Sequence, residues 1–139
     1  EARVVSVVDG DTVVFFPASN VVHTGDLFWN GLFPFIDVQA GGSLHGFINS
    51  ISTLRDMTDD DTHFIPGHGD LAHKADLDSF HQMLLLTQSF IKTARDKGQS
   101  LDHISESGLP GQWESWGLGY ISEQRWIQTV YNSLDSEQP

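Results

Sequence analysis

The hydrophobic residues of this chain change their spacing once, near Ser43, and that change limits the fold class. Before it, β-branched runs over 3–8, 12–16 and 21–23 alternate with turn residues such as Asp9-Gly10-Asp11. This alternation is typical of short strands joined by tight turns. The first part of the sequence therefore predicts three strands in one antiparallel meander.

After Ser43 the spacing becomes helical, with apolar residues at i, i+3, i+4, i+7 and i+10: Leu44, Phe47, Ile48, Ile51 and Leu54. This pattern predicts a helix that ends near residue 56. Later segments predict a long helix over 74–97, a short one over 101–106 and a last helix capped by Ser122. A short strand over 62–65 separates the first two helices. The sequence therefore predicts a fold of the α/β class, and within it of the α+β type.

Two aromatic-rich segments interrupt this pattern. Residues 27–36 contain Gly31 and Pro34 and predict a packed loop, and residues 108–120 predict an irregular connection. Three tryptophans of the C-terminal part are candidates for a ligand-binding wall, although such residues more often fill a core or a dimer seam: Trp113, Trp116 and Trp126.

Composition excludes several functions. The 7 basic and 19 acidic residues give a net charge of −12, so we expect no nucleic-acid partner. The chain has no cysteine, which excludes disulfides and Cys-type zinc sites. No apolar run approaches the ~20 residues of a membrane span, so we expect no membrane partner. The 139 residues suit a single domain over 1–139, and its localisation, cytoplasmic or exported, stays open.

Two glycine-flanked polar residues follow predicted strands. They are Asp26, in Thr24-Gly25-Asp26, and His68, in Pro66-Gly67-His68-Gly69. Loops at strand ends commonly carry functional side chains, because the sheet fixes the backbone on either side. A carboxylate and an imidazole suit Zn²⁺ or a similar divalent ion. By themselves, these two motifs more often mark ordinary turns and caps than a metal site.

Three motifs in order resemble a known family. Residues 21–37 read VVHTGDLFWNGLFPFID, residues 41–43 read GGS and open the helix, and residues 65–69 read IPGHG. Together they resemble the C-terminal half of the metallo-β-lactamase-fold hydrolases, over roughly residues 9–86. The resemblance implies half of an αβ/βα sandwich, with a mixed or antiparallel sheet and helices packed on one face.

The same resemblance implies roles for individual residues. Asp26 matches the aspartate that usually bridges the metal ions, and His68 matches a histidine ligand. The family's His-x-His-x-Asp-His motif is absent, and a further histidine ligand would fall at Val7. A catalytic zinc ion normally has three protein ligands and a water molecule. We therefore expect an incomplete zinc site that is inactive alone and needs the missing N-terminal half.

Two other histidines are further candidates for metal ligands. His23 is adjacent to the Gly-Asp motif, although strand alternation equally places it on the opposite side of the sheet. His45 lies in the first turn of the helix that begins after Ser43, where a capping or solvent role is the ordinary interpretation. The sequence has no Gly-x-Ser-x-Gly elbow and no cysteine, which excludes the common serine and cysteine nucleophiles.

A lone half-sandwich would leave the inner face of its sheet uncovered. The runs 4–8 and 12–16 are nearly continuous in apolar residues, as expected for a sheet that is buried on both faces. The sequence therefore predicts either a homo-oligomer that pairs face to face or a complex with a separate N-terminal half.

Three functions remain open from the sequence. The chain is half of a metal-dependent hydrolase, or a non-catalytic relative that serves as a binding or assembly module, or a metal-binding protein in which His23 or His45 completes a new site.

Overall fold

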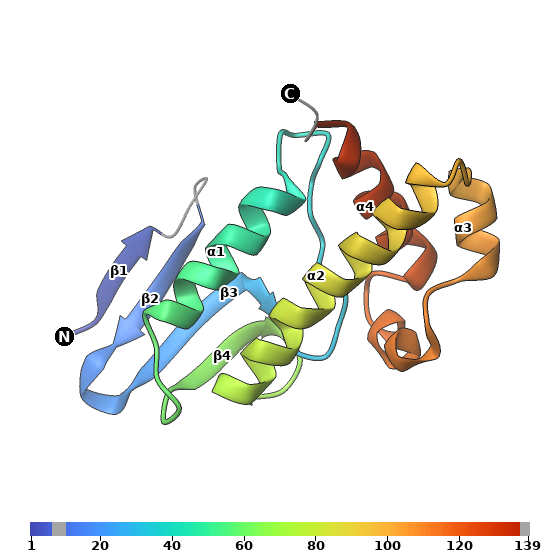
Figure 1. Cartoon of the computed structure of the whole chain (residues 1–139). Helices are drawn as coiled ribbons and strands as arrows, with labels where there is room; N and C mark the ends of the chain where they lie inside the picture. Colours follow the sequence, from blue (N-terminus) through green and yellow to red (C-terminus); the bar gives the residue numbers. More distant parts are fainter. Residues whose placement is uncertain (7–10, 137–139) are drawn as a thin grey trace.

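A single mixed sheet forms one layer of the fold (Figure 1). The computed structural model describes residues 1–6 and 11–136. The five strands follow the order of the sequence: β1 (Arg3–Ser6), β2 (Thr12–Phe16), β3 (Val21–Trp29), β4 (His63–His68) and β5 (Ala72–His73). Neighbouring strands are antiparallel except β3 and β4, which are parallel. The predicted meander of three strands is confirmed, while Val7, Val8 and the turn residues Asp9 and Gly10 lie outside the described residues.

Two strands run further than the sequence predicts. The third strand does not end at Gly25-Asp26 but continues to Trp29, and the fourth passes through Pro66-Gly67 to His68. Gly25 has a φ of 53°, which glycine adopts without steric cost, and the β3–β4 register shifts on either side of it. An irregularity of this kind re-aims side chains without ending a strand. Asp26 and His68 therefore lie in strands rather than on turns.

Two helices cover one face of the sheet. They are α1 (Leu44–Asp56) and α2 (Lys74–Asp96), which lie across the sheet in Figure 1. Ser43 caps α1, since its Oγ accepts a hydrogen bond of 2.9 Å from the backbone N–H of Gly46. Side chains from this face of the sheet are buried beneath the helices: Val13, Val22, Phe64 and Ala72. The predicted half-sandwich with helices on one face is confirmed.

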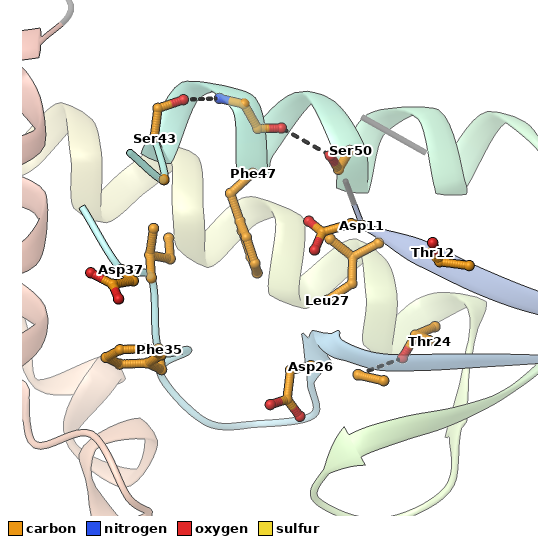
Figure 2. A pocket seen from close by; sticks show the side chains of 14 residues that line it. Asp11, Thr12, Thr24, Asp26, Leu27, Phe35, Asp37, Ser43, Phe47 and Ser50 are labelled. Carbon is orange, nitrogen blue, oxygen red and sulfur yellow. Dashed lines mark hydrogen bonds between the residues drawn. The ribbon is translucent and has the colours of Figure 1, made fainter. Parts of the chain in front are cut away.

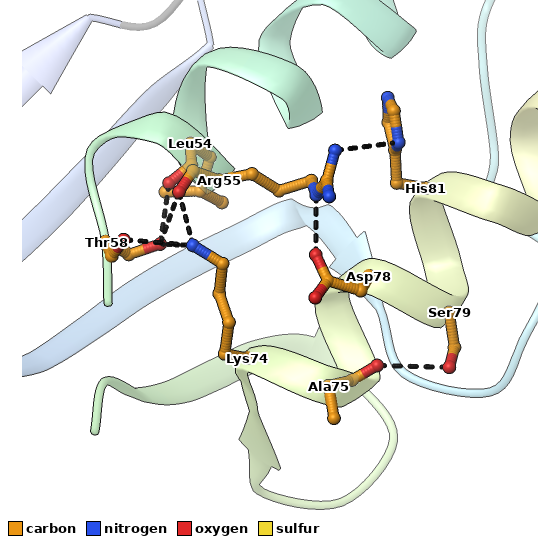
Figure 3. A network of polar contacts seen from close by, with 8 residues as sticks. All are labelled: Leu54, Arg55, Thr58, Lys74, Ala75, Asp78, Ser79 and His81. Carbon is orange, nitrogen blue, oxygen red and sulfur yellow. Dashed lines mark hydrogen bonds and ion pairs between the residues drawn. The ribbon is translucent and has the colours of Figure 1, made fainter. Parts of the chain in front are cut away.

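Polar contacts join the end of α1 to the beginning of α2 (Figure 3). Arg55 Nε lies 2.6 Å from Asp78 Oδ1, and Arg55 also donates to Nδ1 of His81 at 3.2 Å. The Lys74 ammonium donates to the carbonyls of Arg55 and Thr58 at the C-terminal end of α1, where the helix dipole favours a positive charge. Burial and the nearby guanidinium both lower the pKa of His81, so its ring is a suitable neutral acceptor.

The C-terminal part packs against the second half of α2. It consists of α3 (Leu101–Ser107), the 3-10 helix η2 (Gly111–Leu118) and α4 (Glu123–Ser136). The other 3-10 helix, η1 (Pro17–Ser19), lies in the N-terminal part and joins β2 to β3. The predicted cap of α4 is confirmed, because Ser122 Oγ accepts from the backbone N–H of Arg125. No described helix is long and apolar enough to cross a membrane.

The tryptophans of this part fill the core rather than a binding wall. Trp126 is fully buried, its ring is stacked at 5.6 Å on Phe33, and its indole N–H donates to Thr87 Oγ1 at 3.0 Å. Trp113 is 9% exposed, and Trp116 is stacked on Phe80. The core interpretation is therefore confirmed for Trp113 and Trp126, while Trp116 is partly buried and packs against the core.

The other face of the sheet, which we call the open face, carries the alternate side chains of the same strands. Its apolar members are partly or largely exposed: Val4, Val14, Phe16, Val21 and Ile65. Val4 is 71% exposed and Phe16 is 40% exposed. Three exposed histidines accompany them: His23, His63 and His73. Within the described residues, then, the sheet is covered on one face only.

The buried Thr87–Trp126 hydrogen bond gives a prediction about stability. Thr87→Val keeps the side-chain shape but leaves the indole N–H of Trp126 without its partner, which costs about 1–3 kcal/mol of unfolding free energy. Chemical denaturation followed by circular dichroism measures the loss. Thr93→Val, at an exposed position of the same helix, is the matched control and leaves the midpoint almost unchanged. Equal effects of the two substitutions would contradict the prediction.

Candidate metal centre

The candidate metal centre lies where β3 and β4 run side by side toward their ends. These strands are parallel, so the ends that carry Asp26 and His68 meet at the same edge of the sheet. The side chains approach each other, with Asp26 Oδ1 3.3 Å from His68 Nε2. The side chain of Asp26 is 74% exposed and that of His68 is 42% exposed. The structure therefore brings together the two residues that the sequence singled out, and leaves both accessible from solvent.

One buried side chain contacts both members of this pair. The indole ring of Trp29 is stacked on the imidazole of His68, with a centroid separation of 3.7 Å and an interplanar angle of 17°. Its N–H donates to the backbone carbonyl of Asp26 at 2.8 Å. Trp29 is only 2% exposed, so its own orientation is fixed by the core. No local sequence pattern indicates this role of Trp29, because the contact depends on the pairing of two strands.

Glycine permits the close approach of the two strands. A Cβ added at Gly67 would meet Asp26 Oδ1 and would lie 2.7 Å from the carbonyl group of Gly25. Backbone contacts then continue the pairing, since Asn30 donates its backbone N–H to the carbonyl of His68 at 2.9 Å. Residue 67 must therefore lack a side chain for Asp26 to occupy its observed place.

The two additional histidines lie elsewhere. The Nδ1 atom of His23 accepts a hydrogen bond of 3.1 Å from the backbone N–H of Gly25, and its ring belongs to the open face. His45 is exposed in the first turn of α1. Across residues 1–6 and 11–136, no group of three or more His, Asp or Glu side chains is arranged to hold a metal ion. The structure thus joins Asp26 with His68 but adds neither histidine to them.

Two cavities meet at Asp26. The first, of about 270 Å³, lies between the sheet and the start of α1 and is lined by Asp11, Asp37, Ser43 and Phe47, among others (Figure 2). The second, of about 300 Å³, is lined by Asp26, Trp29, Phe35, His68, Tyr120 and Arg125. Four of these residues were not predicted from the sequence as site residues: Trp29, Phe35, Tyr120 and Arg125. Tyr120 and Arg125 lie more than fifty residues beyond His68, so no local motif connects them with the pair.

The geometry of the pair fits part of a zinc shell. Zinc binds imidazole nitrogen and carboxylate oxygen at about 2.0–2.2 Å in a tetrahedral arrangement, which places neighbouring donors about 3.3–3.5 Å apart. The observed 3.3 Å between Oδ1 and Nε2 matches this spacing. Two donors do not reach the three protein ligands of a catalytic zinc site. The pair is therefore suited to be part of a metal site and not the whole of one.

Comparisons with known proteins place the fold. No family model and no curated protein matches the chain. Among solved structures, a double mutant of the sec-alkyl sulfatase PisA1 matches with a TM-score of 0.69 and 18% identity. The stereoselective inverting sec-alkylsulfatase Pisa1 from Pseudomonas sp. matches with a TM-score of 0.68 and 16% identity. These enzymes have the metallo-β-lactamase fold, so the fold relationship inferred from the motifs is supported.

The alignments cover unequal shares of this chain and of the sulfatase chains. The alignments include 93% and 94% of this chain but only 22% and 23% of the sulfatase chains. The chain therefore spans less than a quarter of the length of the proteins it resembles. At this level of identity the likeness establishes the fold alone.

The close contact at Gly67 yields a second prediction. Gly67→Ala forces Asp26 and the Gly25 carbonyl away from β4, which costs about 1–3 kcal/mol of unfolding free energy and separates Asp26 from His68. Denaturation gives the stability, and the NMR shifts of the His68 ring report the local change. Gly111→Ala meets no atom within 4 Å and is the matched control. An unchanged His68 environment in Gly67→Ala would contradict the proposed close fit.

Proposed function

We propose that this chain supplies two ligands to the metal site of a metallo-β-lactamase-fold hydrolase whose remaining ligands come from a complementary N-terminal half. The observation that carries the proposal is the 3.3 Å approach of Asp26 Oδ1 to His68 Nε2. Both residues stand in the motifs that resemble the family's ligand motifs, and the fold is that of the family's solved members.

Trp29 supports the proposal through its effect on the ligands. Metal-bound histidines work best when their rings are held in one orientation by surrounding contacts. The stacked indole restricts the His68 ring, and its N–H holds the backbone of Asp26. The two donors therefore need little rearrangement to share a cation, which lowers the entropic cost of binding one.

A metal ion held by Asp26, His68 and donors of the complementary half would supply a nucleophilic hydroxide at neutral pH and would polarise the bond to be hydrolysed. The residues of this chain contribute by holding their share of the coordination shell and by shaping the second cavity. With only two ligands in place, we propose that the isolated chain lacks hydrolase activity. The missing donors would come from a His-x-His-x-Asp-His segment on the complementary half.

The open face favours a second candidate function. A sheet face with partly exposed valines, isoleucine and phenylalanine is suited to cover a second apolar surface. Two copies of the chain, paired through this face, would form a symmetric assembly without any catalysis. In this alternative the chain is a non-catalytic binding or assembly module, and Asp26 and His68 are remnants of a metal site.

Zinc titration tests the first function. Adding Zn²⁺ to the isolated chain should shift the ring ¹⁵N signals of His68 first, and Asp26→Ala or His68→Ala should weaken zinc binding at least about tenfold, a loss of ~1.4 kcal/mol. His103→Ala, exposed on α3, is the matched control and leaves the affinity unchanged. Hydrolysis assays on β-lactam, thioester, lactone and phosphodiester substrates should show no turnover by the chain alone.

Three results of these experiments would contradict different parts of the proposal. Zinc binding that is insensitive to both substitutions would exclude the pair as ligands. A loss of affinity in His23→Ala or His45→Ala as large as in His68→Ala would instead favour a new site completed by one of these histidines. Metal-dependent turnover by the isolated chain would contradict the need for a second half.

Substitution on the open face tests the association. Val14→Lys places a charge among the exposed apolar side chains of this face and should weaken self-association at least about tenfold in light scattering coupled to size exclusion. Leu86→Lys is the matched control, because it adds the same charge at a 48% exposed position of α2. A wild-type chain that stays monomeric at micromolar concentration would remove the homo-oligomer and leave the complementary half as the partner.

A further inference from the structure

The second cavity has an uneven chemical lining. Asp26 and His68 lie on one part of it, while Phe35, Tyr120 and Arg125 form another. Phe35 is 44% exposed and Tyr120 is 71% exposed, which is unusual for aromatic rings that are free to pack into a core. Apolar rings that stay accessible beside a cation suggest a surface adapted to a ligand.

Arg125 is the cation of this cavity, and among residues 1–6 and 11–136 it has no carboxylate partner. The chain has 19 acidic residues for 7 basic ones, so ion pairs are readily available to an arginine. Arg55 and Arg95 are paired with Asp78 and Asp135. Within the described residues, Arg125 forms no ion pair, and its guanidinium lies instead over two aromatic rings, 5.5 Å from the centroid of Phe35 and 5.6 Å from that of Tyr120.

The place of Arg125 in its helix adds an independent observation. It stands in the first turn of α4, where the helix dipole disfavours a positive charge. Functional sites are places where natural sequences break one or two such local rules. The two rings hold the guanidinium through cation–π contacts, which leave its N–H donors free to bind an anion at the edge of its plane.

We propose that Arg125, Phe35 and Tyr120 form a binding subsite for small organic oxyanions that carry an aromatic or other apolar group. The guanidinium would donate paired hydrogen bonds to the oxyanion, and the two rings would contact the apolar group. Carboxylates best match the planar pair of N–H donors that the guanidinium offers, and phosphate and sulfate esters can accept the same paired hydrogen bonds.

The subsite lies in the same cavity as the candidate metal ligands. A molecule held by Arg125 therefore has its other end within the space that Asp26 and His68 line. That this molecule is the substrate of the hydrolase rests on the proposed function. Binding of the oxyanion itself needs no metal ion and no complementary half, so the two proposals fail separately.

The test uses the full chain without metal and 1-naphthoate as the probe. Isothermal titration and NMR shift mapping should show binding that perturbs Tyr120 and Arg125, with the neutral 1-naphthamide binding at least about tenfold more weakly. Arg125→Gln should lower the affinity for naphthoate at least about tenfold. Arg125→Lys should give an intermediate loss, since it keeps the charge but lacks the planar fork. Naphthyl phosphate and naphthyl sulfate then distinguish among the oxyanion classes.

Arg3→Gln is the matched control, because it removes the same charge at an exposed position of β1 that does not line this cavity. It should leave naphthoate binding unchanged, and circular dichroism verifies that every variant is folded. The proposal is overturned if wild type does not bind naphthoate at millimolar concentration, if naphthamide binds equally well, or if Arg125→Gln binds as tightly as wild type. Equal losses in Arg3→Gln and Arg125→Gln would indicate an effect of net charge alone and would also overturn it.

Discussion

The parallel pairing of β3 with β4 is the interaction on which the candidate site depends. Asp26 and His68 are more than forty residues apart in the sequence, and only this pairing brings their side chains to 3.3 Å. A parallel pair requires a crossover connection, which α1 provides on the covered face of the sheet. The crossover through α1 therefore does more than connect two strands, because it allows the parallel pairing in which the two polar residues meet.

The pairing also explains why the local irregularities occur where they do. The left-handed Gly25 shifts the register immediately before Asp26, and the missing side chain of Gly67 leaves room for the Asp26 carboxylate. From the buried side, Trp29 then holds Asp26 and His68 in this arrangement by contacting both of them. Glycines and an aromatic residue that look like turn and core residues in the sequence act together as the support of one site.

Sequence reasoning predicted what local patterns determine. Helical spacing placed α1 and α2 to within about a residue, Ser122 was correctly predicted as a cap, and the motifs around Asp26 and His68 indicated the fold. It failed where tertiary contacts override local signals. Gly25 and Pro66 predicted strand ends, yet pairing across the sheet carries both strands onward. The second cavity was missed because Tyr120 and Arg125 reach it only through the packing of the C-terminal helices.

Asp26 and His68 are proposed as two ligands of one cation site. Diffraction at the zinc absorption edge, from crystals of the chain grown with Zn²⁺, is the sharpest test of this shared site. Coordination by both residues predicts an anomalous peak within about 2.0–2.2 Å of both Asp26 Oδ1 and His68 Nε2. A peak that lies only on other histidines, such as the exposed His63 and His73, with none between these two atoms, would contradict it.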